Sequence, residues 1–167
     1  MSSVSPKVIV ALDYDNQSDA LALAAQLDPT QCRLKVGKEL FTIAGPAVVE
    51  RLVSSGFDVF LDLKLHDIPN TVQETILGFS GCSIDMLTVH LSGGEKMLEK
   101  ALLAAQRIDA KLIGVSLLTS LGESDSTDLF NSNINNQIMR LLMVAKKINI
   151  DGIVCSPLEL DIANSAL

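Results

Sequence analysis

Short apolar runs recur along the chain, and each is followed by a polar turn and then by a segment with helical spacing of apolar residues. The runs predict six strands, at residues 8–13, 32–37, 57–64, 86–90, 112–118 and 152–156. The segments between and after them predict helices at residues 19–27, 39–54, 71–79, 92–107, 138–148 and 157–166. Strands that alternate with helices imply right-handed βαβ crossovers and a parallel sheet.

Capping residues and breakers set the expected boundaries of these helices. Asn70 follows Ile68-Pro69 and stands three residues before Gln73, which predicts an N-cap with a capping box. Ser92 and Glu95 have the same spacing before the fourth helix, and Gly45-Pro46 predicts a turn or restart inside the second. The polar stretch 122–136, rich in Ser, Asp and Asn, is expected to be a long loop.

Two architectures fit six βα units. An open, doubly wound sheet suits the length of 167 residues, whereas a (β/α)8 barrel typically needs about 250. The charges favour the barrel, because polar residues end successive strands: Asp13, Lys35, Asp62 with Lys64, and His90. A barrel brings these strand ends together in one ring, and an open sheet in general does not. We therefore expect an α/β chain that carries about six units of a TIM barrel.

Composition narrows the class of protein. The chain is 48% hydrophobic with a net charge of −7, which argues against a surface for nucleic acid or anionic membrane. No apolar stretch reaches the roughly eighteen residues of a membrane span, and residues 1–7 do not resemble a signal peptide. Cys32, Cys82 and Cys155 are widely spaced, which predicts reduced thiols in a cytoplasmic protein.

The third strand and its exit carry the densest candidate chemistry. Regular strand alternation would place Asp62 and Lys64 on the same face, and Asp67 follows just beyond. With Asp13 and Lys35 they form an expected ring of three acids and two ammonium groups. Such a ring can hold a preorganised cation against a developing negative charge and can supply a proton. The alternative is a structural ion-pair network or a solvated rim.

Several other residues could bind a ligand or could have purely structural roles. His66 and His90 could bind a metal with Asp62 or Asp67, although hydrogen-bonded loop histidines are commoner. Gly93-Gly94 could hold a phosphate at a helix start or simply allow close packing. Thr119-Ser120 could contact a ligand or end a strand, and the 122–136 segment could be a lid or a solvated connector.

Five segments, in order along the chain, carry a resemblance to a known family. They are Val-Ala-Leu-Asp (10–13), Arg-Leu-Lys-Val-Gly-Lys-Glu-Leu-Phe (33–41), Phe-Leu-Asp-Leu-Lys-Leu-His-Asp-Ile-Pro-Asn-Thr (60–71), Val-His-Leu-Ser-Gly-Gly (89–94) and Leu-Leu-Thr-Ser (117–120). Together they resemble orotidine 5'-phosphate decarboxylases of the bacterial type. The Asp-x-Lys-x-x-Asp-Ile-Pro-Asn-Thr pattern is the most specific of them.

The resemblance implies a TIM barrel that converts orotidine 5'-phosphate to UMP, the last step of pyrimidine synthesis, without metal or cofactor. It implies that Lys64 donates a proton to C6 of the pyrimidine and that Asp62 lies against the substrate carboxylate. Lys35 and Asp67 would complete a charged tetrad, and Asp13 with Lys35 would hold the ribose.

The same resemblance implies a homodimer with shared active sites, in which Asp67 and Thr71 reach the neighbouring subunit. Thr119, with Ser120, would lie near the pyrimidine. Family members grip the substrate phosphate with loops after strands seven and eight, whereas this sequence ends at Leu167. We expect one barrel domain over residues 1–167 without those two strands, and a non-catalytic fragment is the alternative.

Relatives on the same scaffold supply a rival function. The 3-keto-gulonate-phosphate decarboxylases and hexulose-phosphate synthases also carry Asp-x-Lys-x-x-Asp, but they bind magnesium through a glutamate at the second strand exit. Lys35 stands at that exit here, and a cation beside a divalent metal is electrostatically unfavourable. The residues therefore favour the orotidine enzymes.

Overall fold

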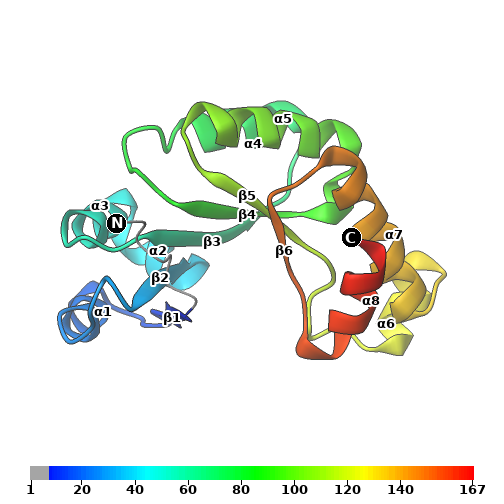
Figure 1. Cartoon of the computed structure of the whole chain (residues 1–167), viewed down its shortest axis with the longest axis horizontal. Helices are drawn as coiled ribbons and strands as arrows, with labels where there is room; N and C mark the ends of the chain where they lie inside the picture. Colours follow the sequence, from blue (N-terminus) through cyan, green and yellow to red (C-terminus); the bar gives the residue numbers. More distant parts are fainter. Residues whose placement is uncertain (1–7) are drawn as a thin grey trace. The chain divides into compact units, whose positions relative to one another are not determined.

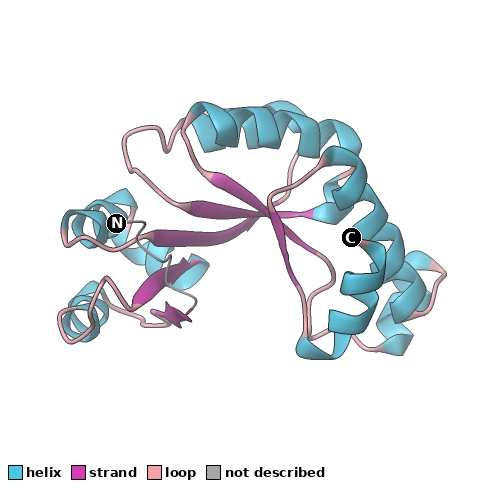
Figure 2. Ribbon diagram, in the orientation of Figure 1, coloured by secondary structure: helices cyan, strands magenta, loops and turns pink. Residues whose placement is uncertain are grey.

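A computed structural model of the chain describes residues 8–167. Residues 1–7, which bear on the expected lack of a signal peptide, lie outside it. Strands and helices alternate along the chain (Figures 1 and 2). The elements are β1 (Val8–Ala11), α1 (Gln17–Ala24), β2 (Cys32–Gly37), α2 (Lys38–Ala44), α3 (Pro46–Ser54), β3 (Val59–Leu65), α4 (Pro69–Leu77), β4 (Met86–His90), η1 (Leu91–Gly93), α5 (Glu95–Arg107), β5 (Lys111–Val115), α6 (Glu123–Phe130), α7 (Ile134–Ile148), β6 (Gly152–Val154), η2 (Pro157–Glu159) and α8 (Leu160–Ala166).

The six strands form one sheet in chain order, β1-β2-β3-β4-β5-β6. The pairs β1–β2, β2–β3 and β5–β6 are parallel, as the alternation of strands and helices predicts. None of the helices within residues 8–167 is long and apolar enough to cross a membrane. The contacts divide the chain into two compact units.

Among the described residues, the first unit comprises 8–63, 75–87 and 105–111. Its helix α1 begins two residues before the predicted start, directly after Asn16, whose side chain accepts a hydrogen bond from the backbone N–H of Asp19 at 2.8 Å. Gly45, with φ of +63°, ends α2, and Pro46 begins α3 directly after it. The predicted restart at this point is therefore confirmed.

Strand β2 has one apolar face and one charged face. Cys32, Leu34 and Val36 are buried, while Arg33 and Lys35 between them are half-buried. This alternation gives one apolar face to the core and leaves the other to polar groups.

The two charged residues of β2 serve opposite ends of the strand. Near its start, the Arg33 Nε lies 3.1 Å from an Asp85 carboxylate oxygen, and the Lys111 ammonium lies 3.0 Å from the other oxygen of Asp85. These residues lie at or just before the amino-terminal ends of β2, β4 and β5, so we interpret them as structural. Lys35 lies nearer the carboxyl end.

The second unit comprises residues 64–74, 88–104 and 112–167, and it corrects one prediction. The stretch 122–136 is not a long loop, because residues 123–130 form α6 and α7 already begins at Ile134. The Asp125 carboxylate accepts a hydrogen bond from the Gly122 N–H at 2.8 Å, and Asn131 ends the helix in the left-handed conformation. The polar residues that indicated a loop are therefore in part the caps of a short helix.

Other boundaries also differ from prediction. Helix α4 begins at Pro69, so Asn70 lies inside it and is not its N-cap, because the fixed φ of proline suits the first helical position. Helix α5 begins at Glu95, since Ser92 belongs to the preceding 3-10 turn. Strand β5 ends at Val115, three residues before the expected end, where the chain leaves the sheet.

Candidate active site

Lys35 lies between two carboxylates in the first unit. Its Nζ is 3.0 Å from Asp13 Oδ1 and 3.9 Å from Asp62 Oδ2. The side chains of Lys35 and Asp62 are 22% and 12% exposed, whereas that of Asp13 is 67% exposed. The pair with Asp62 is therefore better shielded from water than the pair with Asp13. Water screens the electrostatic attraction between the two charges less at this pair.

The strand register explains this arrangement. Lys35 pairs with Ala11 of β1, and Gly37 pairs with Asp62 of β3. Asp13 and Asp62 therefore lie two residues beyond Lys35 on its two sides, which is about 6–7 Å along the strands. An extended lysine side chain covers that distance. The predicted convergence of these three residues at the strand exits is thus present within the first unit.

Lys64 has an unusual backbone for a residue inside a strand. Its φ is +51°, in the left-handed region, although Lys64 lies in β3. Its N–H donates to the Thr88 hydroxyl oxygen at 2.8 Å. Burial still alternates up to this residue, because Leu63 is buried while Asp62 and Lys64 are half-buried, but the backbone is no longer extended at Lys64. The direction of the Lys64 side chain therefore depends on the positive φ of this residue, which the sequence does not predict.

Asp67 and Thr71 lie on the segment that leads into α4. Asp67 accepts a hydrogen bond from the Ile68 N–H at 2.6 Å, and both Asp67 and Thr71 are exposed. Ile68 between them is 66% exposed, which is high for a large apolar side chain. This short segment thus presents a carboxylate, an isoleucine and a threonine at the surface of the second unit.

The two histidines lie together in the second unit. The rings of His66 and His90 have centroids 5.3 Å apart with an interplanar angle of 44°. Among residues 8–167 there is no cluster of three or more His, Cys, Asp or Glu side chains with metal-site geometry. A Cβ at Gly93 would lie 2.2 Å from the Met97 sulfur and 3.4 Å from His66, so Gly93 permits a close approach of the backbone.

Thr119 lines a small pocket in the second unit, and Ser120 does not line it. The pocket has a volume of about 260 Å³, near the lower limit for small-molecule sites. Its other lining residues come from the ends of β5 and β6 and from the starts of α7 and η2: Leu117, Leu118, Leu121, Ile134, Asn135, Ser156, Leu158 and Glu159. Thr119 is therefore an accessible polar group in a largely apolar recess.

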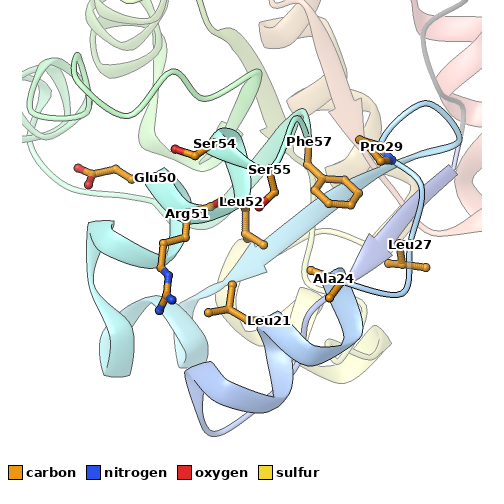
Figure 3. A pocket seen from close by; sticks show the side chains of 11 residues that line it. Leu21, Ala24, Leu27, Pro29, Glu50, Arg51, Leu52, Ser54, Ser55 and Phe57 are labelled. Atoms are coloured by element: carbon orange, nitrogen blue, oxygen red, sulfur yellow. Dashed lines mark hydrogen bonds between the residues drawn. The ribbon is translucent and has the colours of Figure 1, made fainter.

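A larger hollow of about 680 Å³ lies elsewhere, between α1 and α3 of the first unit (Figure 3). Figure 3 shows Leu21 of α1 and Leu52 of α3 pointing toward one another across it. None of the predicted site residues lines it. We interpret it as a loosely packed seam between two helices, because leucine side chains face each other across it and it lies away from the predicted site residues.

Two cysteines are poor candidates for a nucleophile. Burial raises the pKa of Cys155, and the charge of Glu159 raises it further. Burial, with a smaller effect from Glu50, likewise raises the pKa of Cys82. A raised pKa keeps a thiol protonated at neutral pH, and the protonated form is not nucleophilic.

The predicted site residues fall into two sets. Asp13, Lys35 and Asp62 belong to the first unit, where Lys35 pairs with both carboxylates. The others belong to the second unit: Lys64, Asp67, Thr71, Thr119 and Ser120. The sequence analysis did not single out Thr88, which contacts Lys64. In the sequence, Thr88 differs from its neighbours only in carrying a hydroxyl within the apolar run 86–90. Because threonine is common in strands, that signal is weak.

Residues 6–165 match the model of the "Orotidine 5'-phosphate decarboxylase / HUMPS family". A protein from Nitrosomonas europaea named orotidine 5'-phosphate decarboxylase is 51% identical over 158 residues, which are 92% of this chain and 67% of that protein. A protein of the same name from Teredinibacter turnerae is 48% identical, over 95% of this chain and 70% of its own. The chain thus spans about two thirds of the length of these relatives.

Solved structures of proteins with this name resemble the chain as well. The crystal structure of orotidine 5'-phosphate decarboxylase from Lactobacillus acidophilus matches with a TM-score of 0.87 and 34% identity, over 98% of this chain and 77% of that one. The enzyme from Methanocaldococcus jannaschii matches with a TM-score of 0.82 over 98% of this chain and 75% of that one, at 24% identity, which shows the fold alone. The predicted fold class is confirmed, since these neighbours are TIM barrels and this chain carries six of the βα units. The chain belongs to the orotidine 5'-phosphate decarboxylase / HUMPS family, and its named relatives are carboxy-lyases.

Proposed function

We propose that this protein decarboxylates orotidine 5'-phosphate to UMP without a metal or cofactor, as a step of pyrimidine synthesis. The observation that carries the proposal is the arrangement of Lys35 between Asp13 and Asp62 at the ends of three adjacent strands. The names of relatives about half identical to this chain support the same substrate.

Lys64 is the proton donor in the proposed mechanism. The bond between C6 of the pyrimidine and the carboxylate breaks, carbon dioxide leaves, and the electron pair stays on C6. The Lys64 ammonium then gives a proton to C6 and becomes a neutral amine. A cation that faces a charge developing at C6 stabilises the transition state more than the ground state, which is the condition for catalysis.

Lys35 and the acids have supporting roles in this proposal. Asp13 and Lys35 bind the ribose, and Asp62 lies against the departing carboxylate. Lys35 is held by carboxylates on both sides, so its ammonium is fixed before substrate arrives. Thr119, with Ser120, contacts the pyrimidine, and the exposure of Thr119 in a recess is compatible with that role.

The proposal includes a homodimer in which Asp67 and Thr71 complete the partner's site. Both side chains are exposed, and the exposed Ile68 between them provides apolar area that a partner would cover. We also place the protein in the cytoplasm, where thiols stay reduced. The free thiols of Cys32, Cys82 and Cys155 support that placement.

Assay of decarboxylation with EDTA present tests the function directly. We expect the pyrimidine ultraviolet absorbance to change as orotidine 5'-phosphate becomes UMP, at the same rate with and without EDTA. Loss of activity in EDTA that magnesium restores would contradict the metal-free mechanism. Turnover of a 3-keto or hexulose phosphate in magnesium, with none of orotidine 5'-phosphate, would instead assign the rival activity.

A further inference from the structure

The backbone of Lys64 is held by a side chain from the next strand. Its N–H donates to the Oγ1 of Thr88 at 2.8 Å, and Thr88 is completely buried in β4. Both residues belong to the second unit. In a regular parallel ladder, a strand N–H donates to a backbone carbonyl of the neighbouring strand. Here a hydroxyl oxygen takes the place of that carbonyl.

This hydrogen bond coincides with a strained conformation. The φ of +51° at Lys64 is strained for a residue with a side chain, and it persists only where the surroundings enforce it. The penultimate residue of β3 would otherwise continue the extended geometry of the strand. The Thr88 hydroxyl is therefore one of the groups that can stabilise the unusual backbone of Lys64.

We propose that Thr88 is a positioning residue, which fixes the backbone of Lys64 and thereby directs its ammonium group. The inference rests on the proposed function, in which Lys64 gives the proton. Thr88 suits the role because a β-branched side chain has few rotamers and this one is completely buried. Its oxygen therefore has a nearly fixed position, and the N–H of Lys64 is fixed with it.

A small error in backbone direction has a large effect on a lysine. The side chain extends about 6 Å from its Cα, so a rotation of about 10° at the backbone displaces the ammonium by about 1 Å. A misplacement of that size can lower a rate by about 100-fold even when binding survives. The proposal thus predicts an effect on kcat that is larger than the effect on KM.

Thr88→Val tests it, because valine keeps the shape and removes the hydroxyl. We expect kcat for orotidine 5'-phosphate to fall by about 10- to 100-fold, with KM changed less than threefold. Thr88→Ser, which restores a hydroxyl, should recover most of the rate. The control is Ile138→Val, at a completely buried position of α7, which lowers stability to a similar degree and should leave kcat unchanged.

Two further measurements separate positioning from general damage. In a Lys64→Ala background, Thr88→Val should have no additional effect on the residual rate, because it acts through Lys64. Amide hydrogen exchange at Lys64, followed by NMR, should quicken by about tenfold in Thr88→Val and return in Thr88→Ser. The exchange measurement needs no turnover, so it tests the contact even if the protein does not act on orotidine 5'-phosphate.

Each outcome has one interpretation. Unchanged kcat in Thr88→Val, or equal losses in Thr88→Val and Ile138→Val, would overturn the positioning role. Unchanged exchange at Lys64 would overturn the contact on which the role depends. Full activity in Lys64→Ala would instead refute the proposed role of Lys64, and Thr88 would lose its function together with it.

Discussion

At the residue scale, two lysines of the site are held in different ways. Lys35 is held through its side chain, by carboxylates at 3.0 and 3.9 Å. Lys64 is held through its backbone, by the Thr88 hydroxyl. The first arrangement fixes the Lys35 ammonium, which is proposed to bind the ribose. The second fixes the main chain from which the Lys64 side chain extends, which suits the proposed proton donor.

Lys64→Ala should abolish turnover while leaving the fold intact. The change removes both the cation and the proton, so we expect kcat to fall by at least about 1,000-fold. Steady-state decarboxylation measures the loss, and circular dichroism checks the fold. Lys111→Ala is the matched control, because Lys111 pairs with Asp85 at the start of β5. Substantial activity in Lys64→Ala would refute the assigned role.

At the scale of elements, the segment after β5 shows how short polar stretches become ordered. Helix α6 has few apolar residues, but hydrogen bonds hold both of its ends. The Asp125 carboxylate accepts from the Gly122 N–H, and a carboxylate oxygen of Glu123 accepts from the Ile134 N–H at 3.1 Å. The buried Ser126 donates to the Ser132 carbonyl at 2.8 Å. These hydrogen bonds satisfy backbone groups that a helix end leaves open.

Asp125→Ala should lower the stability of the protein. The change removes the acceptor for the Gly122 N–H and an acid from the first turn of α6, at a cost of about 1 kcal/mol. The midpoint of denaturant unfolding, read by circular dichroism, measures the loss. Asp128→Ala in the last turn of the same helix should not lower the midpoint, since an acid is unfavourable there. Equal losses in both variants would contradict the capping interpretation.

At the scale of the whole molecule, the proposed site includes residues of a second subunit. Asp67 and Thr71 are proposed to act in the partner. Family members that match this chain extend beyond it, since it covers 67% of one relative and 70% of another. The proposed dimer is open to a direct test.

Mixing two inactive variants should restore activity if the sites are shared. We expect Lys64→Ala and Asp67→Ala to be inactive alone, and an equal mixture, unfolded and refolded together, to recover about a quarter of the wild-type rate. Half of the dimers are then mixed, and each mixed dimer has one site with both residues. Decarboxylation of orotidine 5'-phosphate measures the recovery.

The control mixture pairs Lys64→Ala with Asp62→Ala. Both residues act within one chain in the proposed mechanism, so no mixed dimer contains an intact site and no recovery is expected. Recovery in this control, or none with Asp67→Ala, would argue that each site is built from a single subunit.

Much of the fold was predictable because its signals are local. The apolar runs identified the six strands of the described residues, and Gly45-Pro46 marked the restart between α2 and α3. Boundaries were less accurate, as at Asn70 and Ser92, because several nearby residues can cap and packing selects among them. The prediction of a long loop at 122–136 was wrong, because the residues that cap a short helix also favour turns.

By itself, the sequence determined the alternation of strands and helices, the charged residues at the strand ends and the family. These depend on residue type and spacing, which are visible in one dimension. Only the tertiary structure decided that the Lys35 ammonium lies between Asp13 and Asp62, because strand register is set by pairing between distant segments. It also decided that Lys64 leaves the extended conformation and donates its N–H to Thr88, 24 residues away. No local propensity encodes that contact, since it exists only when β3 and β4 lie side by side.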